Sequence, residues 1–467
     1  MLSKAINVSN DYRWDSEYYL KDYIINENLL QKLNTNTLVN KTDFIKKGIF
    51  DLPPSNYKEK GVPLIRTSEI KNPTIDFNTT VFINKNTNNK NSKTILNPDD
   101  LVFTKIGAYI GDVAKLPNNY SEYNFSQNVT GVKLKRKEEG AVLLSFFLSK
   151  IGRKQILRSI MLSGQGKLEL EDIRNYKIPV FSNDFEKSIN NIFKSKENIF
   201  NKSKETYTKA ENILLQEIGL KNFTPSKEPV NIKSFKDSFA TSGRLDAEYY
   251  QLKYEQVVNK VKNKNFDTLN NLVDIKKSIE PGSKNYVENG LPFMRVADLS
   301  KNGLSEPQKF ISDSFVKENQ DKINDLKPKK GTILFSKDGS VGIAYHLRQN
   351  YNGITSGAIL HLNVKDETRI LPEYLTLALN SKVVQMQAER DAGGSIILHW
   401  RVGEIENVVV PIIDFDKQRE IADLIEQSFS LKKQSENLLE VAKKAVEIAI
   451  EENEENALEY IKTETNK

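Results

Sequence analysis

The stretch from Ser149 to Pro179 reads SKIGRKQILRSIMLSGQGKLELEDIRNYKIP, and a second version, SKVVQMQAERDAGGSIILHWRVGEIENVVVP, runs from Ser381 to Pro411. The offset is 232 residues throughout, and serine, lysine, glutamine, arginine, isoleucine and the closing proline return at corresponding positions. A constant offset over this much sequence indicates two tandem copies of one structural unit.

Segments upstream of this stretch recur in the same order. The recurring segments are RWDSEYY at 13–19 and RLDAEYY at 244–250, GVPLIRTSEI at 61–70 and GLPFMRVADL at 290–299, and DLVFTKIGAYIGDVA at 100–114 and GTILFSKDGSVGIAY at 331–345. The last pair runs from an apolar strand through a hydroxyl residue, a lysine and a glycine-containing turn to a second strand, which predicts a β-hairpin. The turn is one residue shorter in the second copy, so we expect the loops to differ while the strands persist.

A long helix is predicted after each closing proline. Apolar residues there recur at spacings of three, four and seven between Lys and Glu residues, which is typical of a coiled-coil seam. The stripes consist of Ile189, Ile192, Ile199, Tyr207, Ala210 and Leu214, and of Ile421, Leu424, Leu431, Leu438, Ala442, Ala445 and Ala449. A helix of about 35 residues would be roughly 50 Å long. We expect the two helices to bury these stripes against each other as an antiparallel pair; the alternative is that each packs on its own globular domain.

The sequence therefore predicts an α/β fold of the α+β type, with two tandem similar domains at 1–182 and 223–413 and long helices at 183–222 and 414–467. Residues 84–93 are nearly all Asn, Lys, Ser and Thr, so we expect an exposed loop there. The charged C-terminal residues 451–467 are expected to fray.

Bulk composition narrows the class of protein. The 467 residues include 38% hydrophobic and 28% charged residues and no cysteine, which excludes disulfides, thiolate metal sites and a cysteine nucleophile. The net charge of +6 permits a polyanionic partner without requiring one. We find no signal-peptide pattern and no apolar run of about 18 residues, so we expect a cytoplasmic protein with no membrane association.

The sequence carries no pattern typical of an enzyme active site. Its three histidines, His346, His361 and His399, all lie in the second copy and are not spaced as a zinc-binding pair, so each is expected to be a surface or hydrogen-bonded residue. Neither a phosphate-binding P-loop nor a dinucleotide-binding glycine pattern occurs. We therefore predict no catalytic residue, no metal site and no cofactor of the chain's own.

The duplicated plan resembles the specificity subunit of type I restriction-modification systems. The resemblance rests on the two G-x-P segments, on the hairpin ILFSKDGSVGIA at 333–344, and on VVVPIIDFDKQREIADLI at 408–425, which leads into the second long helix. The first copy departs from the last pattern, because Glu186 stands where the second copy has Gln418. The resemblance covers essentially the whole chain.

This resemblance implies two target-recognition domains, each reading one half of a split double-stranded DNA target. The long helices would set the distance between the half-sites and dock two modification (methyltransferase) subunits, joined by a restriction subunit with motor and nuclease activity. S-adenosylmethionine, ATP and Mg would then belong to those partners, and the chain itself would be non-catalytic. Two alternatives stay open: a scaffold that binds only proteins, and the recognition part of a fused restriction-methylation enzyme.

Candidate DNA-binding residues follow from the chemistry of base recognition. Arg and Lys can pair with guanine, and Asn and Gln with adenine, in the major groove. The candidates are Arg66, Lys105, Gln127, Asn128, Gln165 and Lys167 in the first copy, and Arg295, Lys337, His399 and Arg401 in the second. The two arginines could instead form structural ion pairs, Lys105 and Lys337 could be solvated turn lysines, and Gln127 and Asn128 could cap a turn.

Overall fold

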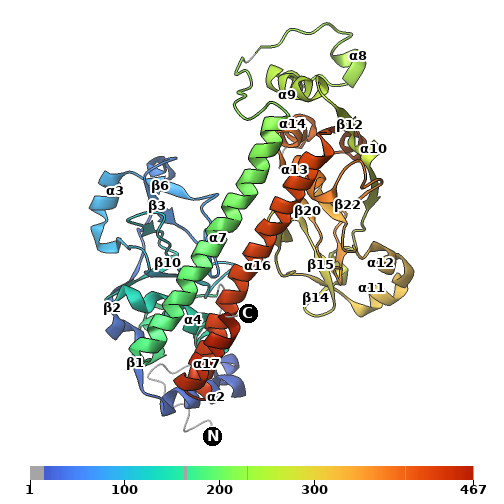
Figure 1. The fold of residues 1–467 in the computed structure, drawn as a ribbon. Helices are drawn as coiled ribbons and strands as arrows, with labels where there is room; N and C mark the ends of the chain where they lie inside the picture. The colour runs from blue at the N-terminus through green and yellow to red at the C-terminus, as the bar shows by residue number, and fades with distance from the viewer. Residues whose placement is uncertain (1–14, 162–165, 229, 395, 466–467) are drawn as a thin grey trace. The chain divides into compact units, whose positions relative to one another are not determined.

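The structure, a computed structural model, describes residues 15–161, 166–228, 230–394 and 396–465 (Figure 1). Its internal contacts divide the chain into unit 1, residues 1–200 with 432–467, and unit 2, residues 201–431. Each unit thus contains one globular part and about half of each long helix. The predicted four-part division, which gave each helix a segment of its own, stays a prediction.

The core of unit 1 is a four-stranded antiparallel sheet. Its order is β2 (Thr42–Lys47), β10 (Val129–Leu134), β7 (Leu101–Thr104) and β8 (Val113–Lys115). Side chains alternate along β7: Leu101 and Phe103 enter one apolar cluster, and Val102 enters another. Helix α4 (Gly140–Leu148) contributes Phe146 and Phe147 to the first cluster, so both faces of the sheet are covered.

Unit 2 repeats this topology strand for strand. Its main sheet has the order β13 (Val273–Lys277), β22 (Ile359–Val364), β19 (Ile333–Ser336) and β20 (Ala344–His346). The same alternation divides β19, because Ile333 and Phe335 enter one cluster and Leu334 another. The internal repeat read from the sequence is therefore a repeat of fold.

Each unit also contains smaller elements. In unit 1 they are β1 (Thr35–Thr37), β3 (Val62–Ile65), β4 (Ile70–Lys71), β5 (Thr74–Ile75), β6 (Val81–Ile83), β9 (Asn124–Phe125), β11 (Lys177–Pro179), α2 (Lys21–Lys32), α3 (Lys85–Lys90), α5 (Lys150–Ser159) and α6 (Leu170–Asn175). In unit 2 they are β12 (Phe266–Thr268), β14 (Tyr286–Val287), β15 (Leu291–Met294), β16 (Leu299–Ser300), β17 (Gly303–Leu304), β18 (Phe310–Ile311), β21 (Ile354–Thr355), β23 (Val409–Pro411), α8 (Phe239–Ser242), α9 (Leu252–Lys262), α10 (Leu269–Leu272), α11 (Asp313–Glu318), α12 (Gln320–Leu326), α13 (Pro372–Asn380), α14 (Lys382–Asp391) and α15 (Val402–Glu406). In each unit a first strand pairs with the proline-terminated strand, β1 with β11 and β12 with β23.

The two long helices are α7 (Asn183–Glu217), with 35 residues, and α16 (Phe415–Glu451), with 37 (Figure 1). In unit 1 the first half of α7 packs on the second half of α16, and in unit 2 the second half of α7 packs on the first half of α16, as an antiparallel pair requires. Serines hold the helices close: Ser435 Oγ donates to the Lys196 carbonyl at 3.0 Å in unit 1. In unit 2 Ser203 and Ser428 each donate to the other's carbonyl, at 2.9 and 2.8 Å. The predicted coiled coil is confirmed.

The same helices also pack on the globular parts, so the alternative packing occurs as well. In unit 1, Ile189 of α7 shares a cluster with Phe147, and in unit 2, Ile421 of α16 shares a cluster with Tyr374. The two ways of burying the stripes are therefore not exclusive. No helix within the described residues is long and apolar enough to cross a membrane.

Two local predictions were wrong. Residues 84–93 include helix α3, because Asn84 caps its first turn through Thr87 N at 2.7 Å and the buried Asn88 hydrogen-bonds to Glu122 and Asn124. Within the described part of the C-terminal segment, Glu454–Thr465 does not fray but forms helix α17. Its apolar side packs into unit 1 through Ala457 and Ile461.

Candidate nucleic-acid interface

Three loops of unit 1 meet at Lys105, directly after β7. Its backbone N–H donates to the Asn128 carbonyl at 2.9 Å, and its own carbonyl accepts from Leu168 N at 3.0 Å. Met161 and Lys167 exchange backbone hydrogen bonds of 3.0 and 3.1 Å at the base of the third loop. Candidates that lie far apart in the sequence, namely Lys105, Asn128 and Lys167, are thus brought to one end of the sheet.

Unit 2 builds the same junction with different residues. The backbone of Lys337 donates to Ala358 O at 2.8 Å and accepts from Trp400 N at 2.8 Å. His399 N donates to Gly393 O at 2.7 Å to close the corresponding loop. The backbone framework is therefore shared, whereas Ala358 replaces Asn128 and His399 replaces Lys167.

The junction of unit 1 has an excess of positive charge. Lys105 is only 3% exposed, which contradicts the alternative of a solvated turn lysine. Burial, reinforced by the neighbouring ammonium groups of Lys47 and Lys167, lowers the pKa of Lys105 to about 8, and the Glu169 carboxylate opposes this shift. Glu169 pairs with Lys167, which holds the pKa of Glu169 below its usual value. A buried ammonium among like charges is costly unless an anion arrives.

The junction of unit 2 is closer to neutral. The Lys337 ammonium pairs with Asp338, and the other oxygen of that carboxylate lies 2.9 Å from His399 Nδ1. Arg401 is exposed, and its backbone N–H donates to Glu404 Oε2 at 3.2 Å. The two junctions therefore present different charge on the same framework.

The duplicated framework is similar in sequence to a known protein family. The type I restriction modification DNA specificity domain matches residues 43–212 and again residues 261–441, about three quarters of the chain. The chain belongs to this family. Each of its two globular parts is thus a specificity domain, and the chain is a DNA-recognition subunit of the type I restriction-modification class.

The solved structures that are similar to this chain share little sequence with it. One is the S subunit of a type I restriction-modification system from M. genitalium, with 14% identity, a TM-score of 0.39, and coverage of 90% of this chain and 95% of that chain. Another is the HsdS subunit from Thermoanaerobacter tengcongensis, with 13% identity, a TM-score of 0.28, and coverage of 91% and 96%. No curated protein sequence matches the chain significantly.

The arginine candidates differ between the specificity domains. In the first, Arg66 forms a bidentate pair with the fully buried Glu69, at 2.8 and 3.1 Å, and also donates to the Thr79 carbonyl at 2.8 Å. This geometry supports the structural ion pair. In the second, Arg295 Nε lies 3.9 Å from Asp298 Oδ2 and is buried without a hydrogen-bond partner among the described residues.

Two further candidates lie on one of these loops in the first specificity domain. Gln127 is half-buried and Asn128 is exposed, on the turn between β9 and β10. Gln165 lies outside the described residues. Whether any of the candidates contacts DNA stays a prediction.

Sequence reasoning missed two residues at this end of the first specificity domain. Lys47, at the end of β2, is the charge with the largest effect on the pKa of Lys105, and the doublet Lys46–Lys47 has a counterpart in Lys276–Lys277 that could have revealed it. Tyr109 is 52% exposed in the turn between β7 and β8, with the Lys71 ammonium 5.3 Å from its ring centre. Nothing in a single tyrosine would have identified it from sequence.

Proposed function

We propose that the chain reads a bipartite, asymmetric double-stranded DNA target, one half through the loop junction of each specificity domain. The observation that carries this proposal is the junction of Lys47, Lys105 and Lys167, where three ammonium groups face one carboxylate. Phosphates would supply the missing negative charge and fix the register of the duplex. Asn128, whose carbonyl is bonded to Lys105, has the side chain to pair with adenine in the major groove.

Differences between the junctions support two unlike half-sites. Lys105 and Lys337 hold equivalent backbone positions, but Asn128 corresponds to Ala358 and Lys167 to His399. Since base readout depends on side-chain donors and acceptors, an amide and an ammonium would select different bases from a methyl group and an imidazole.

We further propose that the chain docks two modification subunits and a restriction subunit, and that S-adenosylmethionine, ATP and Mg act in those partners. Support comes from the segment between α7 and α9 in unit 2, where large apolar side chains face solvent. Ile232 is 91% exposed, Leu245 is 82% exposed, and Val230 and Phe235 are also exposed. Exposed apolar groups concentrated in one segment mark interaction surfaces. In this proposal the chain supplies specificity and no catalytic group.

The test is methylome sequencing of a host that expresses the modification subunits, with this gene intact and with it deleted. We expect the deletion to abolish methylation of one bipartite motif with two unlike halves. A second strain carrying Lys105→Ala and Lys167→Ala should lose most methylation at the same motif. An unchanged methylome in the deletion strain would overturn the proposal and favour a scaffold that binds only proteins.

A further inference from the structure

One histidine of unit 2 has an environment that DNA recognition does not explain. His361 is buried with its Nε2 2.8 Å from Thr355 Oγ1, and His399 is exposed and pairs with Asp338. His346, at the end of β20, is 8% exposed, and its Nδ1 is buried without a hydrogen-bond partner among the described residues. The expectation that each histidine is a surface or hydrogen-bonded residue is therefore wrong for His346.

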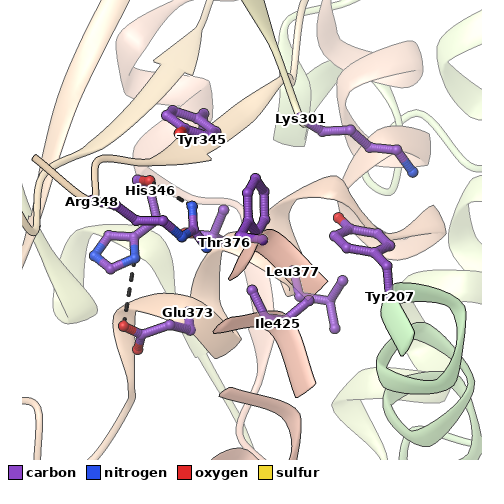
Figure 2. A pocket seen from close by; sticks show the side chains of 10 residues that line it. Tyr207, Lys301, Tyr345, His346, Arg348, Glu373, Thr376, Leu377 and Ile425 are labelled. Atoms are coloured by element: carbon purple, nitrogen blue, oxygen red, sulfur yellow. Dashed lines mark hydrogen bonds and ion pairs between the residues drawn. The ribbon is translucent and has the colours of Figure 1, made fainter. Parts of the chain in front are cut away.

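Two carboxylates converge on this imidazole. Glu373 of α13 places Oε1 3.5 Å from His346 Nδ1, and the two side chains face each other in Figure 2. Glu426 of α16 is the third member, and one ligand atom from each residue lies within 4.8 Å of the others. Three segments that are remote in sequence thus bring one nitrogen and two carboxylate oxygens within 4.8 Å of one another.

We propose that His346, Glu373 and Glu426 bind a divalent transition-metal cation, with Zn²⁺ the best match. Zinc is bound by imidazole nitrogen and carboxylate oxygen at about 2.0–2.2 Å, so ligand atoms of a tetrahedral site lie roughly 3.3 Å apart. The 3.5 Å between His346 Nδ1 and Glu373 Oε1 already fits one edge of that tetrahedron. Side-chain rotation of the half-exposed Glu426 completes the approach, and water fills the fourth position.

In unit 1 the position equivalent to His346 is occupied by Lys115. Lys115 ends β8 opposite Leu101, as His346 ends β20 opposite Ile333. Its ammonium pairs with Asp99 and lies 3.4 Å from Glu197 of α7. A permanent cation thus sits between two carboxylates in unit 1. Unit 2 has an imidazole there instead, and a bound metal ion would restore the positive charge.

Arg348 orients the carboxylate at the mouth of the site. Its Nη2 donates to Glu426 Oε1 at 2.8 Å and its Nε to Oε2 at 3.3 Å, while Nη1 donates to the His346 carbonyl at 3.1 Å. Each carboxylate oxygen has two lone pairs, so Glu426 can keep this contact and bind a cation. His346 Nδ1 has no hydrogen-bond partner among the described residues, so in the tautomer protonated at Nε2 its lone pair is available to a cation.

The test is titration of the metal-stripped full-length chain with Zn²⁺ by calorimetry, with Mg²⁺ in parallel. We expect one saturable zinc site, at least tenfold weaker binding for Glu373→Gln and Glu426→Gln, and no binding at this site for His346→Gln. Hydrogen exchange should slow in β20, α13 and the first half of α16 when zinc is added, because the metal would join these elements.

The matched control is His399→Gln, since the exposed pair of His399 and Asp338 is the obvious adventitious zinc site. It should leave the affinity unchanged. Should His346→Gln not fold, Co²⁺ titration of the wild-type chain decides: intense visible absorption of a tetrahedral site, abolished by Glu426→Gln, is expected. Absence of stoichiometric binding, or loss of binding in His399→Gln alone, would overturn the proposal.

Discussion

Replacing the buried Lys105 by methionine should stabilise unit 1 while weakening DNA binding. Methionine fills a similar volume without a charge. In the wild type Lys105 is 3% exposed and its ammonium is close to those of Lys47 and Lys167, so folding without DNA carries a desolvation and repulsion cost. A residue retained at such a cost is expected to serve binding rather than stability.

The pKa of Lys105 determines the size of the expected change in the free energy of unfolding and the direction of its pH dependence. The pKa falls from 10.5 to about 8, and since each pKa unit corresponds to about 1.4 kcal/mol, the cost of the buried charge at pH 7 is at most about 3.5 kcal/mol. Relaxation around the side chain reduces this, and we expect Lys105→Met to raise the free energy of unfolding by about 1–2 kcal/mol. Between pH 8 and pH 10.5 the unfolded wild-type chain binds more protons than the folded chain, so wild-type stability rises with pH there and the variant's does not.

Native-state hydrogen exchange of β7 and β10 amides at pH 7 reports unit 1 separately from unit 2. DNA affinity is measured on the assembled complex as a function of salt, where loss of one phosphate contact should lower the slope by about 0.9. Lys337→Met is the matched control, because that ammonium is paired with Asp338 and its removal should not stabilise unit 2. A Lys105→Met chain that is less stable than wild type by more than 1 kcal/mol, or that keeps full DNA affinity, would refute the reasoning.

Substitutions at three other contacts have predictable effects on stability or on DNA binding. Arg66→Met leaves the fully buried Glu69 carboxylate without its ion-pair partner and should lower the free energy of unfolding by about 3 kcal/mol, measured by denaturant unfolding. Adding Glu69→Gln should recover most of this loss. Equal stability of the single and double variants would contradict the ion pair. Ser428→Ala removes one of two reciprocal hydrogen bonds with Ser203 and should lower the free energy of unfolding by about 1 kcal/mol. Ser428→Leu should lower it by about 2–3 kcal/mol, because the larger side chain separates the helices. Hydrogen exchange of α7 in unit 2 distinguishes the two variants, and a tolerated leucine would exclude close packing. Tyr109→Ala should change stability by less than 0.5 kcal/mol but weaken target binding severalfold in a gel-shift assay of the complex, and unchanged affinity would remove Tyr109 from the interface.

Equivalent residues of the two copies lie in different environments, so their burial and charge pairing could not be predicted from the sequence. Lys105 and Lys337 share a position in the repeat and the same backbone hydrogen bonds, yet one is buried among lysines and the other pairs with Asp338. A side chain's solvation and pKa depend on groups brought from remote segments. In unit 1 these are Lys47 of β2 and the loop that carries Lys167.

What the sequence by itself determined is the duplication and the long helices. Both are periodic: the offset near 232 repeats whole segments, and the seam repeats every three or four residues, so each can be read without knowing any tertiary contact. Apolar runs on either side of a glycine-containing turn likewise predicted the hairpin strands, because strand and turn preferences are local properties of the sequence.

Only the tertiary structure decided which side chains meet. Helix α3 forms in a polar segment because Asn88 finds Glu122 and Asn124, and α17 is ordered because Ala457 has a core to enter. His346 lies beside Glu373 because β20 packs on α13, a contact that no local pattern announces. Long-range packing determines how deeply a side chain is buried. Burial determines the free-energy cost of a charge there, and this cost shifts the pKa of the group and hence its chemistry.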